Sequence, residues 1–352
     1  MAYTTINKPT DYFNTKLYTG NGSTNAITGV GFQPDWVSIK RRSGGAANGG
    51  VFDALRGVTK LISTSTNDAE QTRADSLTAF GTDGFTLGAD SGNYVNGNSQ
   101  TFVSWNWKAG TTGSGTTTGS GYGKAYSYSV STTAGFSIVK YKGNGSAGHT
   151  IPHHLGTTPS LIFVKNLDAA QSWLVGNTHL GWTRNLHLNE SGVIETTSNI
   201  WNDTAPTSTV FTVGTNSKCN TDDADYIAYV FAEITGYSKW GKYYGTNSTD
   251  GAFLYTGFKP ALMILKRLDG QANSWLILDN KRDTDNLVEN YLFPSESDAE
   301  GNGSGSQGWD FLSNGIKQIN TYGSANQAAN YFFIAFAETP LVGTNNIPCT
   351  AR

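Results

Sequence analysis

Cysteine is almost absent from this sequence. Its 352 residues include only Cys219 and Cys349, which lie far apart along the chain. Small secreted domains that depend on disulfides carry paired cysteines at a much higher density. We therefore expect two free thiols and no disulfide framework.

Charged residues are also scarce, and neither sign dominates. They make up 14% of the chain and leave a formal net charge of −3. Proteins that bind nucleic acid or anionic lipid surfaces need clustered Lys and Arg side chains. The sequence has no such basic tract, so we expect neither nucleic acid nor an anionic membrane surface as a partner.

Long apolar runs are missing as well. No segment approaches the length that a membrane span needs, and the opening residues, Met1–Pro9, lack the apolar core of a signal peptide. We therefore expect a protein that is made in a cytoplasm, stays soluble and does not insert into a membrane.

One strand-like segment occurs three times in the chain. Each copy begins with a proline, continues with an apolar run and ends with a lysine six positions later, as Pro34–Lys40, Pro159–Lys165 and Pro260–Lys266. Proline suits the beginning of a strand, and a continuous apolar run is typical of a strand covered on both faces. We expect each lysine to cover apolar surface with its stem and to lift its ammonium into water.

An aromatic segment follows each copy at a nearly constant distance. The intervals are 73, 72 and 76 positions, for Pro34–Trp107, Pro159–Phe231 and Pro260–Phe336. This spacing indicates a repeat of about a hundred residues, which is larger than solenoid or propeller units and large enough to bury its own core.

The predicted fold is all-β, with three tandem antiparallel β-sandwich modules. Period-two alternation, 42 glycines and frequent turn signals support it. We divide the chain into an N-terminal arm, module 1, a Gly/Ser/Thr linker, module 2, module 3 and a C-terminal tail: residues 1–12, 13–109, 110–131, 132–237, 238–342 and 343–352. Within the linker, 110–123 has the composition of a flexible segment. Apart from a helical patch at 285–292, we expect little helix.

All five histidines fall in the second module: His149, His153, His154, His179 and His187. Histidine is the commonest metal ligand, but three of these lie in one short loop without a cysteine or carboxylate at ligand spacing. The other two modules contain no histidine. We therefore predict no metal site and no cofactor.

Recurring carboxylates raise the question of glycosidase chemistry, which needs two acidic side chains about 5–10 Å apart. Glu233 and Glu338 match each other between modules, and so do the loops Asp68–Glu70 and Asp298–Glu300. Residues fixed by the repeat itself are more often edge or turn groups than catalysts. We predict no catalytic residues and no enzyme.

Binding residues are harder to assign. Trp173 and Trp275 recur in two modules within apolar surroundings, which favours a core role over a sugar-stacking one. Several loop groups suit polar ligands, because Tyr and Asn combine rigid area with adaptable hydrogen bonds. These groups are Asn21, Tyr94, Asn96, Asn144 and Tyr322. The sequence does not indicate which loop binds a ligand.

Several motifs resemble a family of repeat proteins encoded by tailed phages of marine bacteria and cyanobacteria. They are Tyr3–Ile6, Lys16–Gly22, Gly257–Ala261, Leu278–Asp283, Ser297–Glu300 and Phe336–Glu338. That family is named as a domain of unknown function and is commonly labelled as tail fibre or virion structural protein. The resemblance implies concanavalin-like or jelly-roll-like sandwich modules and no catalytic residues. The third module departs from it at Asn314–Lys317, where the other two have a Phe-Thr-x-Gly pattern.

The resemblance implies a non-enzymatic phage virion protein. The expected role is that of a tail fibre or receptor-binding protein that contacts host surface glycan. The alternative is a structural protein of the same particle, either a head decoration or fibre or a tail adaptor, that binds other virion proteins; a glycan-cleaving depolymerase ranks third. We also expect a homo-oligomer, a trimer by analogy with phage fibres, in which the 1–12 arm orders against a neighbour or the virion.

Overall fold

The computed structural model describes residues 3–303 and 307–350, and this part of the chain is almost entirely antiparallel β-structure. It contains no α-helix, and a single 3-10 turn spans Pro9–Asp11. No helix in these residues is long and apolar enough to cross a membrane. Both cysteines are free thiols, as expected. The all-β prediction is confirmed.

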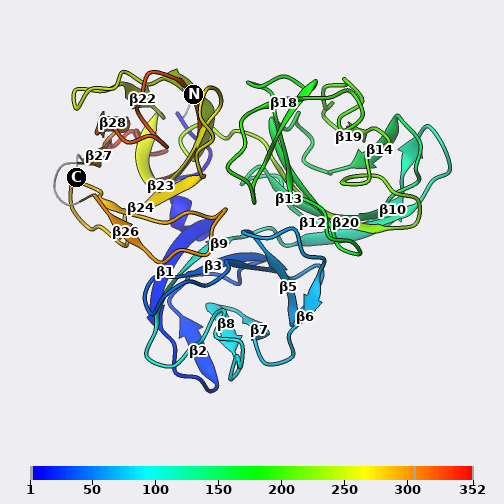
Figure 1. Cartoon of the computed structure of the whole chain (residues 1–352), viewed down its shortest axis with the longest axis horizontal. Coiled ribbons are helices and arrows are strands. Elements are labelled where there is room, and N and C mark those ends of the chain that lie inside the picture. The colour runs from blue at the N-terminus through cyan, green and yellow to red at the C-terminus, as the bar shows by residue number, and fades with distance from the viewer. Residues whose placement is uncertain (1–2, 304–306, 351–352) are drawn as a thin grey trace.

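The strands form three lobes around a common centre (Figure 1). We define lobe 1 as residues 13–107, lobe 2 as 111–231 and lobe 3 as 238–340. Each lobe combines one large sheet with one small three-stranded sheet.

Lobe 1 has a six-stranded large sheet. Its order is β1 (Phe13–Thr19), β9 (Thr101–Trp107), β3 (Trp36–Arg41), β4 (Gly50–Asp53), β5 (Lys60–Ser63) and β6 (Gln71–Thr72). The small sheet has the order β2 (Asn25–Thr28), β8 (Gly84–Leu87) and β7 (Leu77–Gly81).

Lobe 2 has an eight-stranded large sheet. Its order is β10 (Thr111–Thr116), β12 (Ala125–Ser131), β13 (Phe136–Lys142), β20 (Asp225–Phe231), β15 (Leu161–Asn166), β16 (Leu174–Asn177), β17 (Arg184–His187) and β18 (Glu195–Thr196). The small sheet has the order β11 (Thr118–Gly119), β14 (His149–Pro152) and β19 (Val210–Val213).

Lobe 3 has a four-stranded large sheet. Its order is β21 (Ser238–Tyr244), β29 (Asn330–Pro340), β23 (Phe258–Arg267) and β24 (Leu276–Asp279). The small sheet has the order β22 (Phe253–Tyr255), β28 (Gly315–Ile319) and β27 (Gly308–Leu312), and β25 (Asn290–Tyr291) pairs separately with β26 (Gly301–Asn302).

The three large sheets share one strand order at their centre. In each, the last strand of the lobe (β9, β20 or β29) lies between an earlier strand (β1, β13 or β21) and the proline-led strand (β3, β15 or β23). The strand that follows the proline-led strand (β4, β16 or β24) pairs on its far side. The pairings also share a register, since Ser38 faces Trp105, Phe163 faces Tyr229 and Ile264 faces Ile334. Equivalent positions in the three lobes can therefore be compared residue by residue.

Each lobe has a core between its two sheets. In lobe 1, Val37 and Ile39 of the large sheet pack in one cluster with Ile27 and Phe85 of the small sheet. Corresponding clusters fill lobes 2 and 3. This arrangement is sandwich-like, and it accounts for the alternating patterns in the sequence.

The opposite faces of the large sheets meet at the centre of the molecule. A single cluster draws buried side chains from all three lobes, including Phe13, Phe136, Phe231 and Phe336. The ring centroid of Phe231 lies 4.5 Å from that of Phe136 within lobe 2 and 5.9 Å from that of Phe336 in lobe 3. The large sheets are therefore covered on both faces, as the continuous apolar runs predict.

The predicted flexible linker is wrong, because its residues form strands of lobe 2. Strand β10 pairs with β12 along its whole length, at the edge of the large sheet. A Cβ atom on Gly113 or Gly115 would lie 2.5 or 2.8 Å from the hydroxyl of Tyr128 or Tyr126. The glycines thus leave room for two aromatic side chains to cross the edge strand, a use of glycine that composition alone does not distinguish from flexibility.

The helical patch expected at 285–292 is also wrong. Val288 bridges to Trp309 and Leu292 bridges to Ile277, so the apolar residues of this segment serve two extended backbones. The helical spacing of these side chains is overridden by tertiary pairing.

The N-terminal arm packs against its own chain. Ile6 is buried in the central cluster, Thr4 Oγ1 donates to the Thr235 carbonyl at 2.6 Å, and the Tyr3 hydroxyl donates to Gly257 at 2.7 Å. The start of the C-terminal tail joins it, since the Thr344 N–H donates to Asn7 Oδ1 at 3.1 Å. The arm thus orders against lobe 3 and the lobe 2–lobe 3 connection, whereas the sequence led us to expect a neighbour or the virion. Residues 1–2 and 351–352 lie outside the described part.

A central core shared by three lobes predicts one cooperative unfolding transition in scanning calorimetry. Phe231→Ala should lower the stability of the whole chain by about 3–5 kcal/mol, since it removes a ring that contacts two lobes. Phe85→Ala, within the core of lobe 1, is the matched control for a large-to-small change that leaves the centre intact. Three separable transitions, with only one shifted by Phe231→Ala, would contradict a shared core.

Candidate functional site

The three lysines that end the repeated segments are buried. Lys40, Lys165 and Lys266 are at most 2% exposed. Each ammonium donates to one carbonyl of its own lobe and one carbonyl of another lobe. The acceptors are Ala47 and Glu296 for Lys40, Gln171 and Asn67 for Lys165, and Asn273 and Ser191 for Lys266. The expectation that these ammoniums reach water is wrong, because a neighbouring lobe covers each strand end and replaces water with carbonyl oxygens.

We name the contacts between lobes by these lysines. The Lys40 seam joins lobe 1 to lobe 3, the Lys165 seam joins lobe 2 to lobe 1, and the Lys266 seam joins lobe 3 to lobe 2. At each seam a backbone N–H donates to the carbonyl two residues beyond the lysine. The pairs are Glu300 to Arg42, Glu70 to Leu167 and Ile194 to Leu268, at 3.1, 2.9 and 3.2 Å. The three seams repeat one geometry and close a ring.

The recurring carboxylates belong to this architecture. The loops Asp68–Glu70 and Asp298–Glu300 lie at the Lys165 and Lys40 seams, where their glutamates make the backbone contacts just described. Glu233 and Glu338 lie beside Lys239 and Lys259, at 2.8 and 3.4 Å. Each of these four glutamates therefore contacts a basic side chain, and Glu70 and Glu300 also make backbone contacts between lobes.

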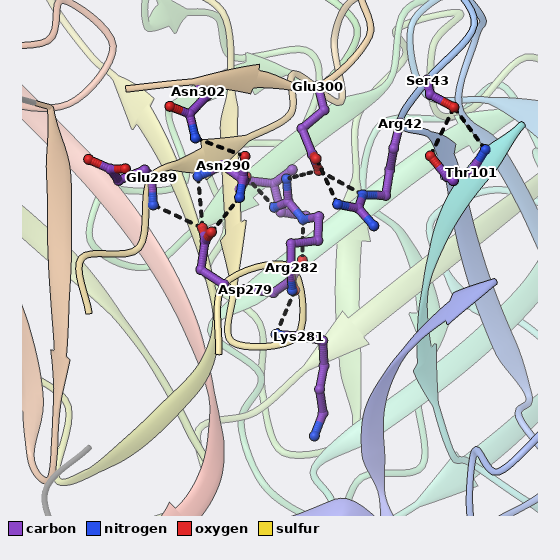
Figure 2. Close-up of polar contacts among 12 residues, drawn as sticks. Arg42, Ser43, Thr101, Asp279, Lys281, Arg282, Glu289, Asn290, Glu300 and Asn302 are labelled. Atoms are coloured by element: carbon purple, nitrogen blue, oxygen red, sulfur yellow. Dashed lines mark hydrogen bonds and ion pairs between the residues drawn. The ribbon is translucent and has the colours of Figure 1, made fainter. Parts of the chain in front are cut away.

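A buried charge cluster forms the Lys40 seam (Figure 2). The Arg282 Nε lies 2.6 Å from Asp279 Oδ2, both side chains are fully buried, and Arg282 Nη1 reaches Glu300 at 3.2 Å. Arg42 of lobe 1 pairs with the same glutamate at 2.8 Å, and Trp105 Nε1 donates to Asp279 at 3.1 Å. Burial opposes the charge of Arg282, but Asp279 and Glu300 outweigh it and raise the pKa of that guanidinium.

The Lys165 seam repeats this cluster with different donors. Asp53, Arg56 and Glu70 stand at the positions of Asp279, Arg282 and Glu300, with Arg56 Nη1 at 3.0 Å from Glu70. Tyr229 replaces Trp105 and donates its hydroxyl to Asp53 at 2.7 Å. In both clusters the aspartate is bound by an arginine of its own lobe and by a donor from the other lobe, as in a structural ion pair.

The Lys266 seam has no such cluster. Its equivalent positions carry Asn177, Leu180 and Ile194, and the donor position in the other lobe is Ile334. An apolar Ile334 cannot donate a hydrogen bond, so a buried carboxylate facing it would lose one of its partners. The buried Asp–Arg pair and that donor are thus absent from the same seam.

Of the three histidines in residues 149–154, two are fully buried and His154 is partly buried. The ring of His149 is buried and bonds Asn220 at 3.0 Å, and His153 is buried beside the small sheet of lobe 2. Burial lowers the pKa of both rings, to about 4 for His153. His154 stacks on Tyr128 with 3.7 Å between ring centroids, and burial also lowers its pKa. The loop that contains three histidines therefore does not gather them around a shared point.

His187 lies in a grouping that the sequence analysis missed. Its Nδ1 is 2.8 Å from Glu190 and its Nε2 is 3.7 Å from Glu195, while His179 lies apart and is about 39% exposed. Partial burial opposes ionisation of Glu190, but hydrogen bonds from Ser172 and His187 outweigh it and lower the pKa of that carboxyl. The signal was present, since a glutamate follows His187 by three positions and another by eight.

Asn96, one of the proposed loop groups, is structural. It is fully buried, and its amide donates to the Gly88 carbonyl at 2.6 Å and the Ser23 carbonyl at 2.7 Å. Asn220 and Asn326 occupy the same role in the other lobes, each joining two loops. These three asparagines fasten the loops at the ends of the sandwiches.

The other loop groups lie nearer the surface but are scattered over the three lobes. Asn21 is exposed and caps its own turn, whereas Asn144 is nearly buried and donates to two carbonyls of the Thr118–Tyr122 region. Tyr94 carries Arg73 over its ring at 4.8 Å, and Tyr322 is half-buried. The structure does not bring these side chains together.

Trp173 and Trp275 are buried at the seams. Their indole N–H groups donate to the carbonyls of Ser63 and His187 in the neighbouring lobe, at 2.7 and 2.8 Å. Neither ring is available for stacking on a sugar.

A pair of exposed aromatic side chains lies elsewhere, on the edge strand β22 of lobe 3. Phe253 and Tyr255 are 44% and 55% exposed, and they share the outward face of the small sheet because they are two residues apart. The ring of Phe253 lies across Gly315, whose added Cβ would fall 2.5 Å from it. The equivalent positions hold small side chains, Ala26 and Thr28 in lobe 1 and Thr150 and Pro152 in lobe 2.

The buried ion pair gives a stability prediction with an internal control. Arg282→Leu should destabilise the chain by about 3–5 kcal/mol, because it leaves Asp279 buried without its partner. The double variant Asp279→Asn/Arg282→Leu copies Asn177 and Leu180 of lobe 2 and should recover most of that loss in denaturant unfolding. A double variant as unstable as Arg282→Leu would show that the uncompensated carboxylate is not the cause.

The seam lysines predict a dependence of stability on pH. Burial lowers their pKa, to about 8 for Lys40 and Lys165 and to about 7 for Lys266. A lysine in the unfolded chain titrates near 10.4, so between about pH 7 and 10 the unfolded state binds more protons and stability rises with pH.

Lys266→Met removes one of these groups and isolates its effect from those of other titrating residues. The free energy of unfolding of wild type, minus that of Lys266→Met, should rise by up to about 1.4 kcal/mol per pH unit from pH 7 to 9. Urea unfolding of both proteins at each pH measures this difference. A difference that stays constant or falls would mean that Lys266 remains charged in the folded protein.

Comparison with known proteins adds the family. No curated protein and no solved structure matches the chain. The match to a family model runs over residues 8–340, which takes in all three lobes and the seams between them. The chain therefore belongs to the family of the domain of unknown function DUF7483.

Proposed function

We propose that this chain is a non-enzymatic virion protein of a tailed phage, built from three tandem β-sandwich modules, and that it acts as a tail fibre or receptor-binding protein on host surface glycan. The resemblance of its motifs to phage repeat proteins supports the particle. The shared strand order of the three lobes supports the modules. The use of the recurring acids in seams and ion pairs supports a role without catalysis.

The observation that carries glycan binding is the aromatic pair on β22. Phe253 and Tyr255 lie two residues apart on an edge strand and are 44% and 55% exposed, whereas most of the large aromatic side chains that the structure describes are buried or half-buried. Aromatic rings with an exposed face pack against the C–H faces of sugars, and Tyr adds a hydroxyl for hydrogen bonding. A rigid small sheet holds the pair in place, which lowers the entropy lost on binding. Each contact is weak, and copies on one particle supply avidity.

The alternative is a structural virion protein that binds other virion proteins, and the ring of lobes favours it. Three equivalent seams give one chain an approximate three-fold shape, of the kind that fits a three-fold position in a particle. The faces of the large sheets are already used within the chain. A homo-oligomer, a trimer included, would therefore use the outer faces of the small sheets or the lobe ends.

Adsorption of the purified protein to host cells and to their isolated surface polysaccharide tests the receptor role. Phe253→Ala/Tyr255→Ala should weaken binding about tenfold or more, since the double change removes both ring faces. Tyr122→Ala is the matched control, because Tyr122 is 87% exposed on lobe 2. Wild-type binding by the double variant would exclude this surface. An image of the virion that places the chain on the head would favour the structural role.

A further inference from the structure

We propose that lobe 2 binds a divalent transition-metal ion between His187, Glu195 and Asn185, at the edge of the Lys266 seam. The proposal is independent of the virion function. It rests on one ligand atom from each of these three side chains and on the carboxylate of Glu190, which contacts the other nitrogen of His187. Asn185 and His187 lie two residues apart on β17, and Glu195 is the cross-strand neighbour of Asn185 on β18. The three side chains therefore converge from one small hairpin.

The tautomer of His187 is set by Glu190. The carboxylate lies 2.8 Å from Nδ1 and accepts the proton there, which leaves the lone pair on Nε2. The Ser172 hydroxyl donates to the other oxygen of Glu190 and holds it in place. A histidine that binds a metal through one ring nitrogen usually donates a hydrogen bond from the other to a carboxylate or carbonyl. The ring is 6% exposed, so its orientation is fixed by packing.

The Nε2 atom of His187 faces a second carboxylate, that of Glu195, and Asn185 Nδ2 forms a hydrogen bond with each of them. Nε2 and Glu195 Oε2 are 3.7 Å apart, beyond hydrogen-bonding range. Two ligand atoms of one small cation, each about 2.1 Å from it, are separated by about this distance.

The amide of Asn185 completes a triangle. Its Nδ2 donates to His187 Nε2 at 3.3 Å and to Glu195 Oε2 at 3.4 Å. A circle through three points 3.3, 3.4 and 3.7 Å apart has a radius of about 2.0 Å. Zinc lies about 2.0–2.2 Å from nitrogen and oxygen ligands. An ion near the centre of this triangle would touch all three corners.

The second observation concerns the same amide. Asn185 is fully buried, and its Oδ1 has no hydrogen-bond partner among the residues that the structure describes. The two orientations of an amide differ only in the exchange of oxygen and nitrogen and are assigned from their partners. Turning the amide over brings Oδ1 to the triangle, where it becomes the third ligand of the ion.

The position of the site explains what the ion does. The segment between β17 and β18 carries Ser191 and Ile194, which bind lobe 3 through Lys266 and Leu268. An ion held by the two strands ties the ends of this segment at the seam that has no buried Asp–Arg pair. One imidazole with two oxygens suits Zn²⁺, Co²⁺, Ni²⁺ or Mn²⁺, and water from the solvent side, where Glu195 is 55% exposed, fills the remaining positions.

Zinc titration of the full chain, without a histidine tag and after treatment with a chelator, tests the site. Calorimetry should give one ion per chain, and zinc should raise the melting temperature. Glu195→Gln should raise the dissociation constant for zinc at least tenfold. Asn185→Asp should strengthen zinc binding by adding a charged ligand. Glu190→Gln should weaken it about 10- to 100-fold through the orientation of His187. His179→Gln, at an exposed histidine of the same lobe, should bind zinc as wild type does.

Three outcomes would overturn the site. The first is wild-type protein that neither binds zinc saturably nor melts higher in its presence. The second is unchanged zinc affinity in Glu195→Gln, and the third is loss of binding in His179→Gln, which would point to a surface histidine. Glu195 is half exposed, so its variant is expected to fold, and its melting temperature without zinc checks this.

Discussion

The structure depends on the burial of both faces of three large sheets. Strands such as β15, with Leu161 to Val164 in succession, present apolar side chains above and below the sheet. The small sheet of each lobe covers one face, and the other lobes cover the second. Without that second cover, each lobe would expose a broad apolar surface, which soluble monomers rarely do. The three lobes are therefore not independent domains on a string, because each supplies part of the core of the others.

This closure places polar groups where water cannot reach them, and the seams are the consequence. Every lysine at the end of a proline-led strand finds two carbonyl oxygens, one from another lobe. At two seams an aspartate and an arginine are buried together, with a Trp or Tyr donor from the neighbouring lobe. A buried ion pair contributes little net stability compared with apolar packing, but a missing partner is costly. Such groups specify which lobe faces which, since a rotated arrangement would leave charges unpaired.

The repeated segment, the all-β class and the burial of both faces of the proline-led strands could be predicted from the sequence, because they follow from local spacing and apolar runs. What covers the second face could not be predicted, since that depends on tertiary neighbours. Lys165 is an example: its ammonium was expected in water, but it donates to the Asn67 carbonyl of lobe 1. The segment 110–123 is another, because Tyr126 and Tyr128 turn its glycines into an edge strand. For the candidate sites, the spacing of His187 and Glu190 was visible, whereas the approach of Asn185 and Glu195 needed the β17–β18 hairpin.

Comparison of the lobes with one another separates scaffold from specialisation. Positions that are equivalent and repeated, such as the seam lysines and the buried Asn96, Asn220 and Asn326, serve the fold in every lobe. Equivalent positions that hold different residue types in the three lobes are not constrained in this way. The exposed aromatic pair and the His187 grouping both lie at such positions. Phe253 and Tyr255 replace Ala, Thr and Pro on the outer sheet of lobe 3, and the His187 grouping stands at the seam from which the ion pair is missing. A scaffold held by three seams tolerates change at its outer faces because those faces contribute little to closure. Binding functions are therefore expected at the differences between the lobes and not at what the lobes share.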